Sequence, residues 1–470
     1  MKNISRYALA ALFLAAVIGG CKSFTKGYAV NPLAPSSSPP TQLFTGAEGA
    51  FDEFMEGFPA QMASMWAQQV TGSDRQFSGY YTYNTSAQDY TNDWGTAYSN
   101  ALMNLRLTES EAAAAGQPNL VGAAKILEGI QMGTVTALWG SVPYSQAAQP
   151  NLTLTPKFDA QLDVYNEVQA ALDSGIALLS ANKSTLPADI FSSKGNPSIW
   201  LAAAHTAKAR YYMHVARQSG YSAAILNQVI TQAQQGILAL SGSQDFMFLH
   251  NKSNGTYNGD MNLWYSFMVY DRSGYMSASK NFAVPMMKAL ARDGKTNDSG
   301  RVAYYFTSNG KGLNTAAEGA YSATSPYPIM RASETHLLMA EAYARLGNTS
   351  SAITELNNAR QYNDNVFGDK SQPYAASDSA VTGATNLLQT ILNEEYLSLM
   401  HQIEVFNLVR RINYQIQYQD STGATVKLTP TIGTQFPQRF FYPTNEINAN
   451  PNTPAQSTSD LFKPTTVNTP

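Results

Sequence analysis

The sequence predicts a mainly α-helical protein in which TPR-like helix hairpins form a scaffold and long loops form a ligand-binding lobe. Helical spacing of apolar residues recurs along most of the chain, and pairs of such segments are separated by Gly or Asn. The segments between the pairs are long and rich in Gly, Asn, Tyr and Ser. We expect three to four hairpins, because a single hairpin cannot bury its apolar side alone.

The N-terminus predicts an export signal and a lipid anchor. Lys2 and Arg6 precede an apolar run of signal-peptide length, which ends in two glycines and Cys21. This arrangement resembles a bacterial lipobox, cleaved before the cysteine, which is then acylated, for example with palmitate. We predict a signal peptide over residues 1–20 and a flexible Pro/Ser-rich tether over 21–42. A secreted protein with an unmodified thiol is the alternative.

Composition excludes several classes of protein. The chain has 470 residues, a formal net charge of −3 and only 13% charged residues, about half the usual share. It lacks Lys/Arg clusters, so no nucleic-acid partner is expected. Cys21 is the only cysteine, which excludes an intramolecular disulfide and a thiolate metal site. We predict that residues 43–470 form a single domain.

Apolar spacing places the helices along this domain. The clearest hairpin spans residues 333–360, in which Ala340 and Tyr343 share one face of the first helix and Gly347 with Asn348 ends it. The second helix is lined by Ala352, Ile353, Leu356 and Ala359. The other predicted helices are 44–69, 93–107, 119–138, 163–179, the hairpin 198–217 with 223–240, and 387–411 as one long helix or a bent pair.

The remaining segments have no helical period. Residues 71–92 are polar and are predicted as a long loop, a class that is often functional. Irregular insertions are expected over 241–327, 361–386 and 413–470, with one short strand pair near residues 425–428.

Catalytic signatures are missing from the sequence. It contains no phosphate-binding loop, nucleophile elbow or zinc-protease motif. No pair among the five histidines has metal-ligand spacing with an acid nearby, so no metal-binding residues and no cofactor are predicted, while the presence of a structural cation stays open. Glu394 and Glu395 are adjacent on a helix and therefore point about 100° apart. This disfavours a glycoside hydrolase, and we predict a protein that is not an enzyme.

Two aromatic stretches are more informative. A sugar needs flat aromatic surfaces flanked by polar hydrogen bonders, and residues 66–84 and 254–272 supply both. We predict that they meet across one shallow site. Packing within the loop lobe is the alternative for these rings, while Trp94, Trp139 and Trp200 are expected in the core. The candidates are Trp66, Gln69, Arg75, Tyr80, Tyr81, Tyr83 and Asn84 in the first stretch, and Tyr257, Asn258, Asp260, Asn262, Trp264, Tyr265, Tyr270 and Asp271 in the second.

Three further stretches, in order after the lipobox, are similar to one known family. Residues 139–144 read W-G-S-V-P-Y, residues 327–342 read Y-P-I-M-R and continue to Glu334 and Glu341, and residues 439–446 read R-F-F-Y-P-T-N-E. Together they resemble the SusD/RagB family of outer-membrane nutrient-binding lipoproteins. The E-G-x-R stretch common in that family is replaced by residues 402–405, Q-I-E-V, which favours the divergent SusD-like branch.

The resemblance implies a function. The expected protein captures oligosaccharides at the outer membrane and delivers them to a SusC-like TonB-dependent transporter, which the helical half should face. A peptide-binding importer subunit is the alternative, although low charge and 27 tyrosines suit a neutral glycan. Acidic residues that often follow the lipidated cysteine in surface-exported members are absent from residues 22–26, so the cell surface and the periplasmic face both remain open.

Overall fold

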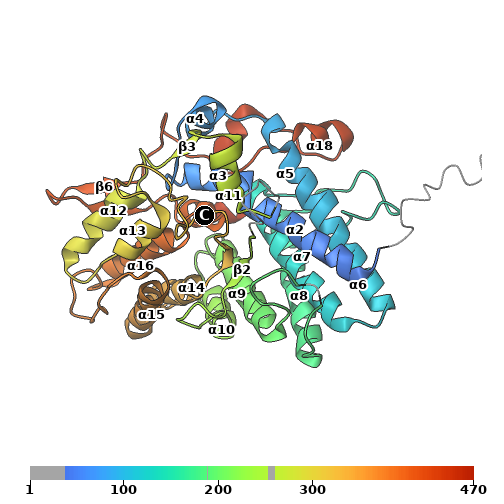
Figure 1. Ribbon diagram of the computed structural model, residues 1–470, viewed down its shortest axis with the longest axis horizontal. Coiled ribbons are helices and arrows are strands. Elements are labelled where there is room, and N and C mark those ends of the chain that lie inside the picture. Colours follow the sequence, from blue (N-terminus) through green and yellow to red (C-terminus); the bar gives the residue numbers. More distant parts are fainter. Residues whose placement is uncertain (1–37, 188, 252–259, 470) are drawn as a thin grey trace, which may run out of the picture. The chain divides into compact units, whose positions relative to one another are not determined.

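The computed structural model describes residues 38–187, 189–251 and 260–469. Residues Pro40–Pro470 form one compact unit, mainly helical as predicted (Figure 1). Cys21, the signal peptide and most of the tether lie outside the described residues. The longer helices are α2 (Pro40–Glu56), α3 (Phe58–Trp66), α6 (Met103–Ala114), α7 (Pro118–Trp139), α8 (Gln161–Ala181), α9 (Pro197–Ala216), α10 (Ala223–Ala233), α14 (Ala332–Arg345), α15 (Thr349–Phe367), α16 (Ala384–Ser398) and α17 (Glu404–Arg411).

Shorter elements complete the fold. All three strand pairs among the described residues are antiparallel: β1 with β3, β2 with β4, and β5 with β6. The last pair confirms the strands predicted near residues 425–428. The short helices are α4 (Arg75–Tyr81), α5 (Thr91–Gly95), α11 (Leu263–Ser266), α12 (Ala283–Leu290), α13 (Ser299–Tyr305) and α18 (Thr444–Ala449). The strands are β1 (Thr71–Gly72), β2 (Phe246–Phe248), β3 (Met276–Ser277), β4 (Tyr327–Met330), β5 (Gln417–Gln419) and β6 (Thr425–Lys427).

Helix pairs stack in series across the lower part of Figure 1. The pairs are α7 with α8, α9 with α10, and α14 with α15, and neighbouring pairs touch through α8 with α9 and α10 with α14. The shorter α16 and α17 pack against each other and form the predicted bent pair. The expectation of three to four hairpins is therefore confirmed.

Local sequence explains the clearest hairpin. Gly347, with a left-handed φ of 79°, follows α14, and Asn348 caps α15 by accepting a hydrogen bond of 3.2 Å from the Ser351 amide. Ala340 and Leu356 belong to one buried cluster between the two helices, as their spacing predicts. Both ends of the turn are thus specified by residues within the turn.

Other predicted elements need correction. The segment 44–69 is two helices, because Pro59 near the start of α3 favours a new helix rather than the continuation of α2. Residues 71–92 are not a loop: they form β1, α4, a 3-10 turn over Ala87–Tyr90 and the start of α5. In the described part of the insertion 241–327, seven short helices and strands precede β4, and the helix predicted over 223–240 ends at Ala233.

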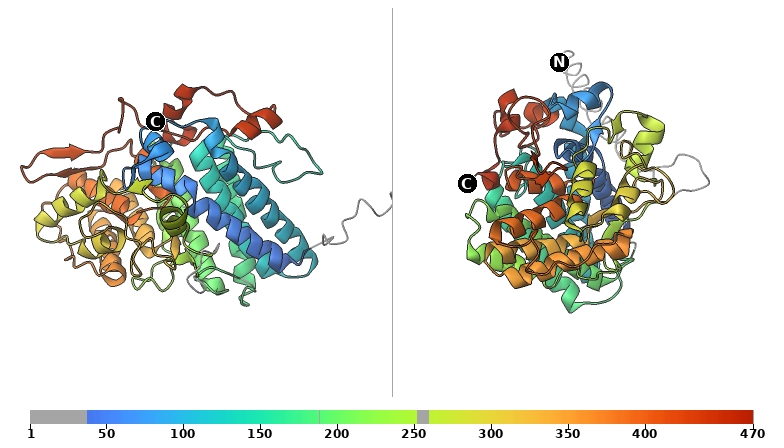
Figure 2. Two further views of the ribbon diagram at one scale, coloured as in Figure 1. Left: turned by 45° about the horizontal axis from the view of Figure 1, so that its top comes forward. Right: turned by 90° about the vertical axis from the view of Figure 1, so that its left-hand side faces the viewer.

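The two ends of the unit meet in the core. The Trp139 indole donates to the Phe441 carbonyl at 2.7 Å, and the Tyr442 hydroxyl donates to the Ser141 carbonyl at 2.7 Å. The Trp139 and Phe440 rings lie 5.3 Å apart, edge to face. Figure 2 shows the C-terminal segment, in red, beside the N-terminal helices, in blue. Within the part of the chain that the structure describes, no helix has the length and hydropathy needed to cross a membrane.

Candidate ligand-binding site

The first aromatic stretch contacts the second through Phe77 and Phe267 and pairs with the strand that follows it. Strand β1 pairs with β3, with Thr71 opposite Ser277, and the Ser73 amide donates to the Tyr275 carbonyl at 2.7 Å. In Figure 1, α4 and β3 lie together at the upper edge, near α11. Segments about 200 residues apart in the chain therefore share one surface. Tyr257 and Asn258 lie outside the described residues.

A cluster of rings holds the two segments together. Phe77 of α4 lies 4.7 Å from Phe267 and 5.9 Å from Tyr275, measured between ring centroids. The guanidinium carbons of Arg75 and Arg272 lie 5.7 Å and 6.0 Å from the Tyr275 centroid. Cation–π contacts of this kind fix the two cations beside the ring.

Around this cluster, aromatic and polar groups reach the solvent. Tyr270 is 44% exposed, and its ring lies 6.0 Å from the half-buried Tyr265 at an angle of 70°. Arg75 and Arg272 are exposed, whereas Tyr275 is only 9% exposed. We name Arg75, Tyr265, Tyr270, Arg272 and Tyr275 the aromatic platform. Tyr275 lies just beyond the predicted stretch and was missed, although it continues the same Tyr-rich and Gly-rich sequence.

Three predicted ligand-binding residues lie in the core, so these predictions are wrong. Trp66, Gln69 and Trp264 have no exposed surface. The Trp66 indole donates to the Tyr80 carbonyl at 3.0 Å, and the Gln69 amide donates to the Tyr396 carbonyl at 2.7 Å. A ligand outside the protein cannot touch any of the three.

Tyr81 and Tyr83 are mostly buried as well, at 7% and 6% exposure. The Tyr83 hydroxyl accepts a hydrogen bond of 2.9 Å from the Thr431 amide, and the Thr431 hydroxyl donates to the Tyr81 carbonyl at 2.6 Å. Burial raises the pKa of Tyr81 to about 12. These contacts favour packing against the segment around Thr431.

The other candidates differ in their surroundings. Tyr80 is half-buried and donates to Asp89 at 2.8 Å, and Asn84 is exposed. Buried Asn262 caps α11, because its side-chain oxygen accepts a hydrogen bond of 3.1 Å from the Tyr265 amide. Exposed Asp271 accepts a 3.4 Å hydrogen bond from Ser266. Asp260, also exposed, lines a separate cleft beside α2.

A cavity of about 660 Å³ lies between α12 and α13. Its lining includes the apolar residues Met287, Val302 and Phe306, and none of the predicted site residues. Apolar walls suit a small hydrophobic ligand better than a sugar, which requires polar groups beside aromatic faces. We therefore place the candidate site on the aromatic platform.

Comparison with known proteins decides the family. A family model described as "Starch-binding associating with outer membrane", SusD-like, matches residues 32–443. The chain belongs to this SusD-like family. No curated protein is significantly similar to it in sequence.

Solved structures share the fold of this SusD-like protein at low identity. A SusD/RagB family protein from Bacteroides thetaiotaomicron is 18% identical with a TM-score of 0.66, covering 92% of this chain and 99% of its own. A chitin-binding SusD homolog from Flavobacterium johnsoniae is 16% identical with a TM-score of 0.63, covering 91% and 99%. A Bacteroidetes SusD-like protein is 15% identical with a TM-score of 0.68, covering 92% and 100%.

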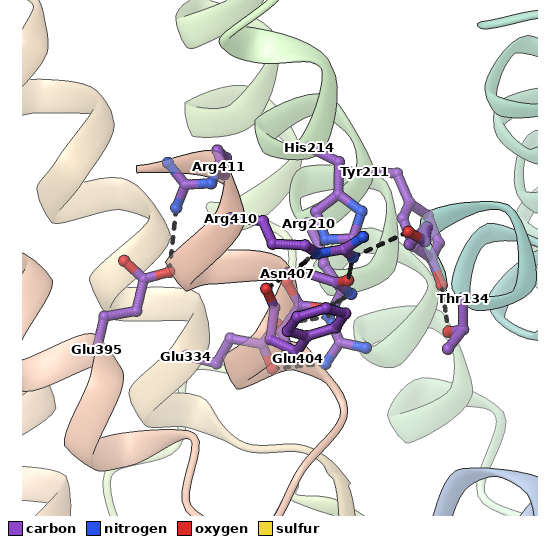
Figure 3. Close-up of polar contacts among 12 residues, drawn as sticks. Thr134, Arg210, Tyr211, His214, Glu334, Glu395, Glu404, Asn407, Arg410 and Arg411 are labelled. Atoms are coloured by element: carbon purple, nitrogen blue, oxygen red, sulfur yellow. Dashed lines mark hydrogen bonds and ion pairs between the residues drawn. The ribbon is translucent and has the colours of Figure 1, made fainter. Parts of the chain in front are cut away.

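The SusD-like motif acids Glu334 and Glu341 lie in a buried ion network between helix pairs, and Figure 3 shows the part of it around Glu334. Arg210 of α9 binds both oxygens of Glu334 at 2.6 Å and 2.7 Å, and the Arg411 guanidinium of α17 binds both oxygens of Glu341 at 2.6 Å and 2.7 Å. His214 contacts Glu404 at 2.7 Å. These acids therefore connect α9, α14 and α17 within the core.

The adjacent acids considered for hydrolysis also belong to the SusD-like core. Glu394 contacts Arg301 at 2.7 Å, and Glu395 contacts Arg411 at 3.5 Å. Each carboxylate is 3% exposed and faces a different arginine. They do not form a carboxylate pair open to a substrate.

Proposed function

We propose that this SusD-like protein binds a neutral oligosaccharide on the aromatic platform and delivers it to a SusC-like TonB-dependent transporter at the outer membrane. The observation that carries the proposal is the exposed Tyr270 beside Tyr265, on a segment that also carries exposed Arg272. The description of the family, which names starch binding, and the chitin-binding relative support a glycan as the ligand.

The chemistry of the platform suits a sugar. A tyrosine face can stack on the C–H patch of a pyranose ring, while the Arg75 and Arg272 guanidinium groups can donate hydrogen bonds to its hydroxyls. In an exposed, wet site each such contact contributes about 1–1.5 kcal/mol. Several weak contacts therefore have to act together, which suits an oligosaccharide better than a single sugar.

We infer a binding role rather than catalysis. The adjacent acids Glu394 and Glu395 are buried in ion pairs, and this argues against the hydrolase alternative. The family description mentions starch and the name of one relative mentions chitin, which gives no support to the peptide alternative. In our proposal the stacked helix pairs face the transporter, because regular helical surfaces suit contact with another protein.

Membrane attachment through Cys21 is part of the proposal. Cys21→Ala should move the protein from the membrane fraction to the soluble periplasmic fraction and abolish incorporation of a radiolabelled fatty acid. A variant that stays in the membrane fraction with the mobility of the wild type would contradict the lipid anchor.

Affinity electrophoresis over a panel of polysaccharides first identifies the glycan that the protein retains. Calorimetry with maltoheptaose and chitohexaose then tests the site. Tyr270→Ala and Arg272→Ala should each weaken binding of the retained glycan about tenfold, which corresponds to about 1.4 kcal/mol, without changing the melting temperature. Tyr212→Ala is the matched control, since Tyr212 is a half-buried tyrosine on α9 in the helical half.

Two results would refute this function. One is unchanged affinity in both platform variants, which would move the site elsewhere. The other is release of reducing ends from the retained polysaccharide, which would make the protein an enzyme.

A further inference from the structure

Helix α2 presents three buried carboxylates on one face. Glu48, Asp52 and Glu56 follow each other at intervals of four residues, so their side chains lie along one side of the helix. All three are at most 3% exposed. Within residues 38–187, 189–251 and 260–469, no lysine or arginine pairs with them, and the cationic group that contacts them is His250.

His250 is oriented as a metal ligand would be. Its Nδ1 lies 3.1 Å from the Asp260 carbonyl oxygen, and its Nε2 lies 2.7 Å from a Glu56 carboxylate oxygen. Because a carbonyl can only accept, Nδ1 donates its proton to Asp260, and Nε2 is left as the nitrogen that faces the acids, where a metal ion would take the place of its proton. A carbonyl that fixes the ring in this way is the usual outer partner of a metal-bound histidine.

Asp52 supplies a second, independent observation. Its Oδ1 atom is buried and has no hydrogen-bond partner among the described residues. A buried polar atom without a partner is destabilising, and a cation at this position would satisfy it. One ligand atom each from Asp52, Glu56 and His250 lie within 4.8 Å of one another. Ligand atoms around a four-coordinate ion are about 3.4 Å apart, so small side-chain rotations bring these three into place.

We propose that Asp52, Glu56 and His250 bind a divalent transition-metal ion, with Zn²⁺ the best match. One imidazole nitrogen and two carboxylates form a donor set that Zn²⁺ accepts, whereas Ca²⁺ requires six to eight oxygen ligands. Three protein ligands leave a fourth position open. A cleft of about 500 Å³, lined by Asp52, Phe248, Asn251 and Leu263, gives access to the site.

The ion has a structural consequence nearby. The second oxygen of Glu56 accepts a hydrogen bond of 2.9 Å from the Leu263 amide at the start of α11. A metal that fixes the Glu56 carboxylate therefore also fixes the first residue of the helix that carries Tyr265. The metal site itself does not depend on the proposed glycan function.

The test uses the mature full-length chain after treatment with a chelator. Calorimetric titration with ZnCl₂ should show one equivalent bound per chain, and Zn²⁺ should raise the melting temperature. Asp52→Asn and His250→Gln should each weaken binding at least tenfold. Glu53→Gln, which removes an exposed acid next to Asp52, and His205→Gln, which removes a histidine on α9, are the matched controls and should retain binding.

A measurement on the unaltered chain covers the case in which a variant fails to fold. Co²⁺ should give the visible absorption of a four-coordinate ion, and one of the five histidines should show a metal-dependent Nε2 shift in ¹⁵N NMR. The proposal is overturned if Zn²⁺ does not bind, if Asp52→Asn and His250→Gln both bind as the wild type does, or if Ca²⁺ binds more tightly than Zn²⁺. None of these readouts involves a glycan.

Discussion

Replacing Glu341 by glutamine tests whether buried ion pairs hold the helix pairs together. Glu341 of α14 has no exposed surface and accepts hydrogen bonds from Arg411 at 2.6 Å and 2.7 Å and from Arg345 at 2.7 Å. Glu341→Gln keeps the shape but removes the charge, so the only carboxylate left to pair with Arg411 among the described residues is Glu395, at 3.5 Å. Breaking a buried pair from one side costs about 3–5 kcal/mol.

The pH dependence gives a second measure of the same contact. Burial alone raises the pKa of Glu341, but the guanidinium groups of Arg411 and Arg345 outweigh it and lower the pKa to about 2. A shift of this size corresponds to about 3 kcal/mol. Because the folded pKa lies below the unfolded one, this stability is present above about pH 4.5 and is lost as the pH falls towards 2.

Urea unfolding followed by tryptophan fluorescence measures both effects. At pH 7 the variant should have a free energy of unfolding about 3–5 kcal/mol below that of the wild type, and the difference should shrink by pH 3. Glu111→Gln, the same change at an exposed position on α6, should stay within about 0.5 kcal/mol. A loss no larger than that of Glu111→Gln, or a loss that is equal at pH 7 and pH 3, would refute the reasoning.

Three further substitutions test packing and backbone geometry, each by urea unfolding. Trp264→Ala should lower the free energy of unfolding by about 3–5 kcal/mol, because the side chain is fully buried. A variant with unchanged stability and weaker glycan binding would instead show that Trp264 belongs to the ligand-binding site. Tyr83→Phe removes the hydroxyl that accepts a hydrogen bond from the Thr431 amide, and it should lower the free energy of unfolding by about 1 kcal/mol. Unchanged stability would mean that this hydrogen bond contributes nothing. Gly140→Ala should lower the free energy of unfolding by about 1–3 kcal/mol, because the backbone at Gly140 has φ of 90° and ψ of −122°. The loss should be larger than that of Gly116→Ala, where φ is 66° and the added methyl group meets no atom within 4 Å.

The sequence predicted helix pairs well where the signals are local. Gly347 and Asn348 lie within the turn that they specify, so the start and the turn of the 333–360 hairpin were located to within one or two residues, whereas α15 continues to Phe367. Helix α4 was missed because it has only seven residues, and the pairing of β1 with β3 holds it from about 200 positions away. Sequence periodicity does not report on contacts of that range.

The site was harder to predict, for a different physical reason. Polar neighbours suggested that Trp66 and Trp264 reach the solvent, but those neighbours are themselves buried. Gln69 donates to the Tyr396 carbonyl at 2.7 Å, and Asn262 donates to the Ser325 carbonyl at 3.1 Å. In a lobe built from short elements, many backbone groups lack a partner in a helix or sheet, and buried amide side chains supply the missing hydrogen bonds.

The contact between Trp139 and the C-terminal segment has a consequence for the order of folding. The Phe440 amide donates to the Leu138 carbonyl at 2.9 Å, and the Phe440 ring packs against Trp66, Tyr90 and Trp139. These contacts close loops of about 300 residues or more, and the entropy of closing them must be lost before they can form. A chain that is still being synthesised and has not reached residue 440 therefore lacks the ring at the centre of its own aromatic core. The native aromatic core can therefore close only once the C-terminal segment is present, whereas the helix pairs are built from contacts between neighbouring parts of the chain.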